Sequence, residues 1–191
     1  IVSSTQALSY AFGGWEQPWG IVFVIDGANL YLILLVAFIS VIATLYAYTI
    51  LASEIAVEDL PKAYAVWLLA IASLFGLSMT GDAFNLFVFL EISALSSITL
   101  IALGAGQDRR ALLAAYNYLI IGAIGATFYV IGVGYLYAAT GSLNLIDIVD
   151  RLNELGTNQA AITGLAFMLA GIMVKAGVFP VHIWLPAAYS Y

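Results

Sequence analysis

The stretch AFNLFVFLEISALSSITLIAL, from Ala83 to Leu103, decides the fold class, because Glu91 is its only charged residue. A helix that crosses the hydrocarbon core of a bilayer needs about 20 predominantly apolar residues. Four further stretches reach that length, namely Ala28–Ser53, Ala63–Gly81, Ala111–Ala139 and Ala160–Val181. Only helices fit, because five strands cannot close a barrel and open sheet edges are not tolerated in lipid. The sequence therefore predicts an all-α polytopic membrane protein with about five transmembrane helices.

Composition supports this class and excludes several others. Of the 191 residues, 64% are hydrophobic and 8% are charged, whereas a soluble domain is about half apolar and a quarter charged. Five Lys and Arg residues against eleven Asp and Glu residues argue against nucleic-acid binding, which needs a basic surface. There is no Cys and only one His, which excludes disulfides, thiolate metal sites, iron–sulfur clusters and a haem held from both sides by this chain. We therefore expect no cofactor and no metal.

A shorter helix is predicted between the last two spans, over Leu145–Leu155. Its apolar residues share one face and its charged residues the other, which is typical of a helix lying flat at a membrane interface. Asn144 is suited to the N-cap of this helix and Gly156 to the position after its last turn.

The basic residues predict how the chain is oriented in the cell membrane. Loops 54–62 and 104–110 lie on one side and contain Lys62, Arg109 and Arg110. The opposite side, with residues 1–26 and loop 140–159, contains only Arg151. Because loops rich in Lys and Arg stay in the cytoplasm, we expect loops 54–62 and 104–110 to be cytoplasmic and residues 1–26 to form an extracytoplasmic segment.

Two charged residues fall inside the predicted spans, Glu91 and Lys175, whereas the other fourteen lie at span ends or in loops. A charge near the bilayer centre costs roughly 2.5–3.5 kcal/mol on insertion scales. Such residues usually face the interior of a helix bundle and mark an ion or proton pathway. These two positions are therefore the strongest functional signal in the sequence.

Glu91 has only apolar neighbours on its own helix face, so its partner must come from another helix. Burial favours the neutral form of a carboxyl group and a nearby cation favours the charged form. A group held between these two influences can exchange protons at cellular pH. The alternative is a static buried ion pair that only fixes helix packing.

Lys175 lies six residues before the end of the last predicted span. Burial allows an ammonium group to release its proton, although Lys175 could also extend to the interface. Pro180 cannot donate a backbone hydrogen bond, and with Gly177 it predicts that this helix is broken near Pro180. If the helix stayed regular, His182 would fall on the Lys175 face, either as a proton relay or as a hydrogen-bonded packing residue.

Two other features are interpreted as structural. Asp82 is suited to cap the helix that carries Glu91, with a vestibule carboxylate as the second interpretation. Gly122 and Ala126 have a small-xxx-small spacing that allows helices to approach closely.

Two sequence motifs also resemble the signatures of a known protein family. The segment GDAFNLFVFLEI, from Gly81 to Ile92, resembles a signature of the antiporter-like, proton-translocating subunits shared by complex I and Mrp cation/proton antiporters. The segment KAGVFPVHIWLPA, from Lys175 to Ala187, resembles the second signature of that family. The residues Gly13-Gly-Trp15, Pro18 and Gly20-Ile21 are similar to the approach to the third helix in the D subunits of Mrp antiporters.

The resemblance implies roles for three residues. Glu91 corresponds to the glutamate on the fifth helix of the family and Lys175 to the lysine on its broken seventh helix. His182 matches a position often filled by a polar residue on the proton path. Family members have about fourteen helices in two inverted repeats, so the resemblance implies that residues 27–191 form part of the first repeat, a partial proton-conducting transmembrane domain with helices three to seven.

The leading hypothesis is a proton-translocating subunit of a multi-subunit sodium/proton antiporter, with other membrane subunits as partners. The alternative is the same kind of subunit in a membrane-bound hydrogenase or an NADH:quinone oxidoreductase. The chain has no redox ligands, so any electron transfer would take place in partner subunits, and a transporter subunit is favoured over an enzyme. A third possibility is a scaffold whose ion pair is only structural.

Overall fold

The computed structural model describes residues 7–106, 108–156 and 158–190. Within these ranges the chain forms seven α-helices, a two-stranded sheet and two 3-10 turns. The strands are β1 (Leu8–Ala11) and β2 (Val22–Ile25), and the turns are Phe12–Gly14 and Gly104–Gly106. The helices are α1 (Gly27–Glu54), α2 (Leu60–Met79), α3 (Ala83–Leu103), α4 (Arg110–Thr140), α5 (Leu145–Leu155), α6 (Gln159–Lys175) and α7 (Trp184–Ser190). The predicted all-α class is confirmed, and the small sheet is an addition that the sequence did not predict.

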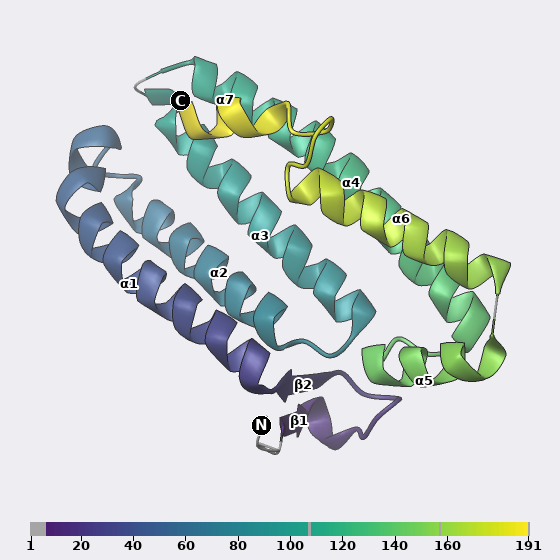
Figure 1. The fold of residues 1–191 in the computed structure, drawn as a ribbon. Helices are drawn as coiled ribbons and strands as arrows, with labels where there is room; N and C mark the ends of the chain where they lie inside the picture. The colour runs from purple at the N-terminus through teal and green to yellow at the C-terminus, as the bar shows by residue number, and fades with distance from the viewer. Residues whose placement is uncertain (1–6, 107, 157, 191) are drawn as a thin grey trace.

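The long helices lie side by side in chain order (Figure 1). α2 packs between α1 and α3, and α4 packs against both α3 and α6. Figure 1 shows α5 lying across one end of this layer and α7 near its opposite end. The helices α1 to α4 are long and apolar enough to cross a membrane. The fifth predicted span is the shorter helix α6, with 17 residues.

Polar side chains begin several of these helices as the sequence predicted. The Asp82 carboxylate accepts a hydrogen bond from the backbone N–H of Asn85 at 2.7 Å, which caps α3. Asn144 caps α5 in the same way by accepting from the N–H groups of Ile146 and Asp147. Each cap satisfies N–H groups that have no partner within the helix, so the positions of these helix starts are encoded locally.

The last predicted span ends earlier than expected, and Gly177 is the reason. The sequence predicted a helix that continued to Val181, but α6 ends at Lys175. Gly177 has a φ of 64°, its N–H donates to the Val174 carbonyl at 3.2 Å, and the N–H of Val178 donates to the Met173 carbonyl at 3.0 Å. This is the Schellman pattern, in which a left-handed glycine ends a helix. The break therefore precedes Pro180 by several residues.

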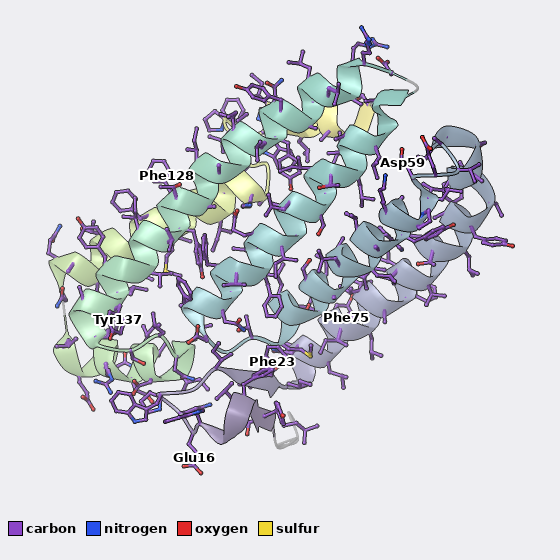
Figure 2. The ribbon with its side chains drawn as sticks, turned by 180° about the vertical axis from the view of Figure 1, so that it is seen from behind. Glu16, Phe23, Asp59, Phe75, Phe128 and Tyr137 are labelled. Atoms are coloured by element: carbon purple, nitrogen blue, oxygen red, sulfur yellow. The ribbon has the colours of Figure 1, made fainter. Side chains whose placement is uncertain are left out.

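Apart from Glu91 and Lys175, the charged side chains of the described residues lie toward the two ends of the molecule. In Figure 2, Glu16 lies at the end with the strands and Asp59 lies at the opposite end. Between them the outer faces of the helices carry exposed apolar side chains such as Phe38 and Leu45. An apolar band between two polar ends matches the profile of a bilayer.

The end with the strands is tied together by backbone hydrogen bonds. The strands pair antiparallel, with Leu8 opposite Ile25. The Gly81 N–H donates to the Val22 carbonyl at 2.9 Å, and the Ala83 N–H donates to the Leu143 carbonyl at 2.8 Å. The hairpin and the start of α5 therefore hold the turn from which α3, the helix of Glu91, begins.

Candidate functional site

The two charged residues singled out within the spans lie next to each other. Glu91 is in the middle of α3 and Lys175 is the last residue of α6. The Lys175 Nζ atom lies 3.1 Å from the Glu91 Oε1 atom, although 84 positions separate the two residues in the chain. The side chain of Lys175 is 10% exposed and that of Glu91 is 30% exposed. The pair is therefore a partly buried ion pair.

Close packing of α4 on α6 brings Lys175 to this place. A Cβ atom added to Gly171 of α6 would lie 2.5 Å from the Gly125 carbonyl oxygen of α4, and one added to Gly132 would lie 2.5 Å from the Gly164 carbonyl oxygen. These contacts require glycine, because a side chain would overlap the facing backbone. A close approach of α4 to another helix was predicted from the spacing of Gly122 and Ala126, and the structure shows such an approach at Gly125 and Gly132 instead.

Gly122 has a different part in the site. A Cβ atom at this position would lie 3.9 Å from the Lys175 Nζ atom, so the ammonium group lies next to α4 at Gly122. Helix α4 packs against both α3, which carries Glu91, and α6, which carries Lys175. The separation of 3.9 Å is an ordinary van der Waals contact, so the head of Lys175 packs beside Gly122.

The end of α6 also favours a positive charge on Lys175. The last carbonyl groups of a helix carry partial negative charge, and a cation in the last turn is stabilised there. Lys175 occupies the last turn of α6. The helix end and the Glu91 carboxylate therefore act on the same ammonium group.

The break after α6 is fixed by Trp184. The indole N–H of Trp184 donates to the Val174 carbonyl at 3.1 Å, one residue before Lys175. Trp184 is buried, and its ring stacks on Tyr118 of α4 with centroids 4.2 Å apart. Neither aromatic residue was predicted from the sequence to belong to the site. The signal that could have found Tyr118 is its place one turn before Gly122 on the same helix face.

A regular helix would have placed His182 on the same face as Lys175, but the structure does not. It belongs to the connection between α6 and α7, since the helix has already ended at Lys175. Its ring lies 5.6 Å from that of Phe179, measured between centroids. Within the described residues its buried Nδ1 atom has no hydrogen-bond partner, so this atom forms no hydrogen bond with Glu91 or Lys175. A role for His182 in proton movement stays a prediction.

Asp82 caps the start of α3 and is buried there. The loop 104–110 follows the opposite end of the same helix. Burial raises the pKa of the Asp82 carboxyl, and hydrogen bonds from the backbone N–H groups of Asn85 and Phe84 act in the opposite direction. The first interpretation, a cap, is confirmed. Within the described part of the chain, no three His, Asp or Glu side chains gather as metal ligands would.

Comparison with known proteins gives consistent matches. Residues 80–191 match a family model described as NADH:quinone oxidoreductase/Mrp antiporter, transmembrane. The chain is 49% identical to NADH-quinone oxidoreductase subunit N of Desulforudis audaxviator over 182 residues, which is 95% of this chain and 36% of that protein. It is 33% identical to the D subunit of the Na(+)/H(+) antiporter of Bacillus subtilis over 180 residues, which is 94% of this chain and 35% of that protein.

Solved structures show the same relationship. The chain resembles a chain of the archaeal membrane-bound sulfane sulfur reductase complex with a TM-score of 0.84 and 34% identity, over 94% of this chain and 35% of the other. The chain thus spans about a third of the length of the proteins that it matches.

Proposed function

The chain belongs to the NADH:quinone oxidoreductase/Mrp antiporter family of multi-pass membrane proteins, and we propose that it translocates protons as a subunit of a larger membrane complex. The observation that carries this proposal is the Glu91–Lys175 pair, with its atoms 3.1 Å apart. Paired ionisable groups inside membrane helices are typical of proton relays.

The pair offers a simple mechanism. While the two groups are in contact, the Lys175 ammonium donates a hydrogen bond to the Glu91 carboxylate. When the contact opens, the carboxylate becomes a proton acceptor and the ammonium a proton donor. The end of α6 at Lys175, which Gly177 brings about, makes such opening possible, because Lys175 sits at a helix end and not within a continuous helix. Movement of the residues that follow Lys175 can therefore control proton transfer.

We propose that loops 54–62 and 104–110 face the cytoplasm and that residues 1–26 are extracytoplasmic. Both loops lie at the same end of the helical layer, opposite the strands (Figure 1). Three of the five basic residues, Lys62, Arg109 and Arg110, belong to these loops, and basic loops stay on the cytoplasmic side.

Two kinds of complex fit this function. A sodium/proton antiporter is supported by the 33% identity to the D subunit of such an antiporter. A respiratory complex such as an NADH:quinone oxidoreductase, or a hydrogenase, is supported by the 49% identity to a subunit N and by the structural similarity to a respiratory membrane complex. In either case the other membrane subunits are partners, and electron transfer would belong to those partners. A sodium gradient drives proton movement in the first case, and oxidation of an electron donor drives it in the second.

The decisive experiment replaces Glu91 by glutamine in the complete complex, reconstituted in vesicles with a pH-sensitive dye. Glutamine keeps the shape and the hydrogen bonding but cannot ionise. We expect the rate of proton movement to fall by a factor of about 100 or more, the lower range for loss of an acid–base group, while the complex assembles normally.

The matched control is Glu58→Gln, because Glu58 is an exposed glutamate in the loop between α1 and α2. This control should transport protons at the wild-type rate. Wild-type transport by a normally assembled Glu91→Gln complex would show that Glu91 carries no protons and leave the ion pair as a packing element.

A further inference from the structure

A cavity separate from the ion pair lies between the membrane-spanning helices α1, α2 and α3. Its volume is about 750 Å³, and neither residue of the ion pair lines it. Its walls include Ala43 and Ala47 of α1, Ala63 and Trp67 of α2, and Leu100 of α3. Ligand pockets measure roughly 300–1,000 Å³ and are lined mostly by hydrophobic and aromatic side chains with a few polar groups. This cavity, called the α1–α2 cavity below, therefore has the size and the lining of a ligand site.

The polar groups of the α1–α2 cavity gather at one of its ends. Among the described residues that line it, the non-aromatic polar ones are Ser53, Glu54 and Asp108. They belong to the last turn of α1 and to the loop before α4, which lie at the end of the helical layer opposite the strands (Figure 1). The cavity thus has a polar mouth where the helices end and an apolar interior between them.

The indole of Trp67, deeper in the cavity, has no donor left for a ligand. Its N–H donates to the Thr44 hydroxyl oxygen at 2.9 Å, and an indole has only this one donor. The Thr44 hydroxyl in turn donates to the Ser40 carbonyl at 2.7 Å. Because these groups are satisfied within the protein, the interior of the cavity suits a hydrocarbon chain.

A smaller cavity follows along the same two helices. Its volume is about 170 Å³, and it is lined by Trp67, which it shares with the larger cavity, and by Val36 and Leu74. From Leu51, at the mouth of the larger cavity, to Val36 there are fifteen residues of α1, a rise of about 22 Å. One leaflet of the hydrocarbon core is about 15 Å thick. The two cavities together are therefore long enough for an acyl chain that extends through one leaflet.

The charge at the mouth favours one kind of headgroup. Asp108 is paired with Arg110, with 2.7 Å between Oδ2 and Nη2. Glu54 has no ion-pair partner among the residues that the structure describes. Of the charged side chains that line the cavity, Glu54 is thus the one left to attract a cation and to repel an anion. A headgroup that ends in an ammonium fits this mouth better than an anionic one.

We propose that the α1–α2 cavity binds a phospholipid whose headgroup ends in an ammonium, as in phosphatidylethanolamine. One acyl chain of the lipid lies along α1 and α2 beside Trp67, and the ammonium binds the Glu54 carboxylate. The chain also gives α1 packing contacts, which the protein supplies sparsely, since no residue of this helix is buried.

The test measures lipid binding to the complete complex by native mass spectrometry. The complex is purified in detergent, freed of weakly bound lipid, and offered phosphatidylethanolamine or phosphatidylglycerol with the same acyl chains. We expect one phosphatidylethanolamine to bind about three-fold more tightly than phosphatidylglycerol, because an ion pair at an exposed carboxylate contributes modestly.

The first pair of variants tests the interior of the cavity. Ala47→Phe places a ring in the space for the chain and should weaken binding of phosphatidylethanolamine by about ten-fold or more, because each methylene kept out of the cavity loses its burial. The matched control is Ala52→Phe, since Ala52 is exposed on the same helix and does not line the cavity. This control should bind the lipid as the wild type does.

The second pair tests the mouth without changing the interior. Glu54→Gln should abolish the roughly three-fold preference for phosphatidylethanolamine. Glu58→Gln, at an exposed glutamate that does not line the cavity, should keep it. Because Glu54 is exposed as well, this pair decides the question even if Ala47→Phe does not assemble.

Three outcomes overturn the inference. Undiminished lipid binding in Ala47→Phe means that the α1–α2 cavity is not the site. Equal binding of both lipids by the wild type, or a preference that Glu54→Gln retains, excludes the ammonium contact. A quinone or a helix of a neighbouring subunit seen in the cavity by electron cryomicroscopy of the complete complex identifies a different occupant. None of these measurements involves proton movement, so the inference and the proposed function can fail independently.

Discussion

The helices α1 and α4 are similar in length and apolar character but differ in how they pack. None of the residues of α1, all of which the structure describes, is buried. In α4 eleven residues are buried. Hydropathy therefore selects the segments that enter the membrane, and another property decides which of them pack tightly.

That property is side-chain size. Lipid tails are as apolar as leucine, so membrane helices gain little from hydrophobicity when they associate, and close packing must supply the attraction. The glycines of α4 and α6 allow backbone contact, whereas the middle of α1 carries large side chains that are exposed, among them Phe38 and Leu45. The ion pair is found on the tightly packed side, where a long side chain can be held in one place.

The largest expected effect comes from the lysine itself. If Lys175 only neutralises Glu91, Lys175→Arg should be tolerated, because arginine keeps the charge and pairs strongly with carboxylates. If Lys175 must release its proton in each cycle, arginine should fail, because guanidinium does not lose its proton in proteins. We expect both Lys175→Arg and Lys175→Ala to lose proton transport by a factor of about 100 or more. Near-normal transport in Lys175→Arg with loss in Lys175→Ala would make Lys175 a fixed counter-charge.

The next effect measures the difference between the two helices directly. Leu136 of α4 is 2% exposed and Leu45 of α1 is 67% exposed. Leu136→Ala leaves a cavity in the core and should lower the free energy of unfolding by about 2–5 kcal/mol. Leu45→Ala removes contacts with lipid only and should stay within about 0.5 kcal/mol. Thermal unfolding of the purified complex provides the comparison, and equal losses at both positions would mean that α1 is covered by protein in the complex.

A smaller effect tests the glycine contact. Gly171→Ala places a methyl group 2.5 Å from the Gly125 carbonyl oxygen, which should push α6 away and cost about 2 kcal/mol. At Gly134 of α4, apart from the nearby backbone of α4 itself, no described atom lies within 4 Å of the added Cβ. Gly134→Ala should therefore be neutral or gain up to about 1 kcal/mol from helix propensity. Thermal unfolding again gives the comparison, and similar stability in both variants would show that the two helices can separate freely.

The smallest effect concerns the cap of α3 and depends on pH. Because burial raises the pKa of Asp82, the folded state holds this proton more tightly than the unfolded state. Stability from this group is therefore complete below the ordinary Asp pKa, about 4, and is lost as the pH rises toward the raised pKa. Asn caps as well as Asp and does not titrate. Asp82→Asn should match the wild type near pH 4 and exceed it by about 1 kcal/mol or less near neutral pH. An unfolding temperature that falls relative to the wild type as the pH rises would contradict this.

Much of the fold could be predicted because its signals are local. The spans follow from runs of apolar residues, and the caps at Asp82 and Asn144 act on N–H groups two or three residues away. The end of α6 was misplaced although its signal is also local. The sequence analysis placed the break near Pro180, with Gly177 as a contributor, whereas Gly177 adopts the left-handed conformation that ends the helix first.

The sequence by itself determined which segments enter the membrane, where most helices begin, and that Glu91 and Lys175 are the charges without local partners. Only the tertiary structure decided that these two meet at 3.1 Å, that the head of Lys175 lies beside Gly122 of α4, and that Tyr118 and Trp184 complete the site. The physical reason is the range of the interactions. Hydropathy and capping act within a few residues, whereas these contacts join α3, α4 and the segments on both sides of the break, and their geometry depends on how closely whole helices pack.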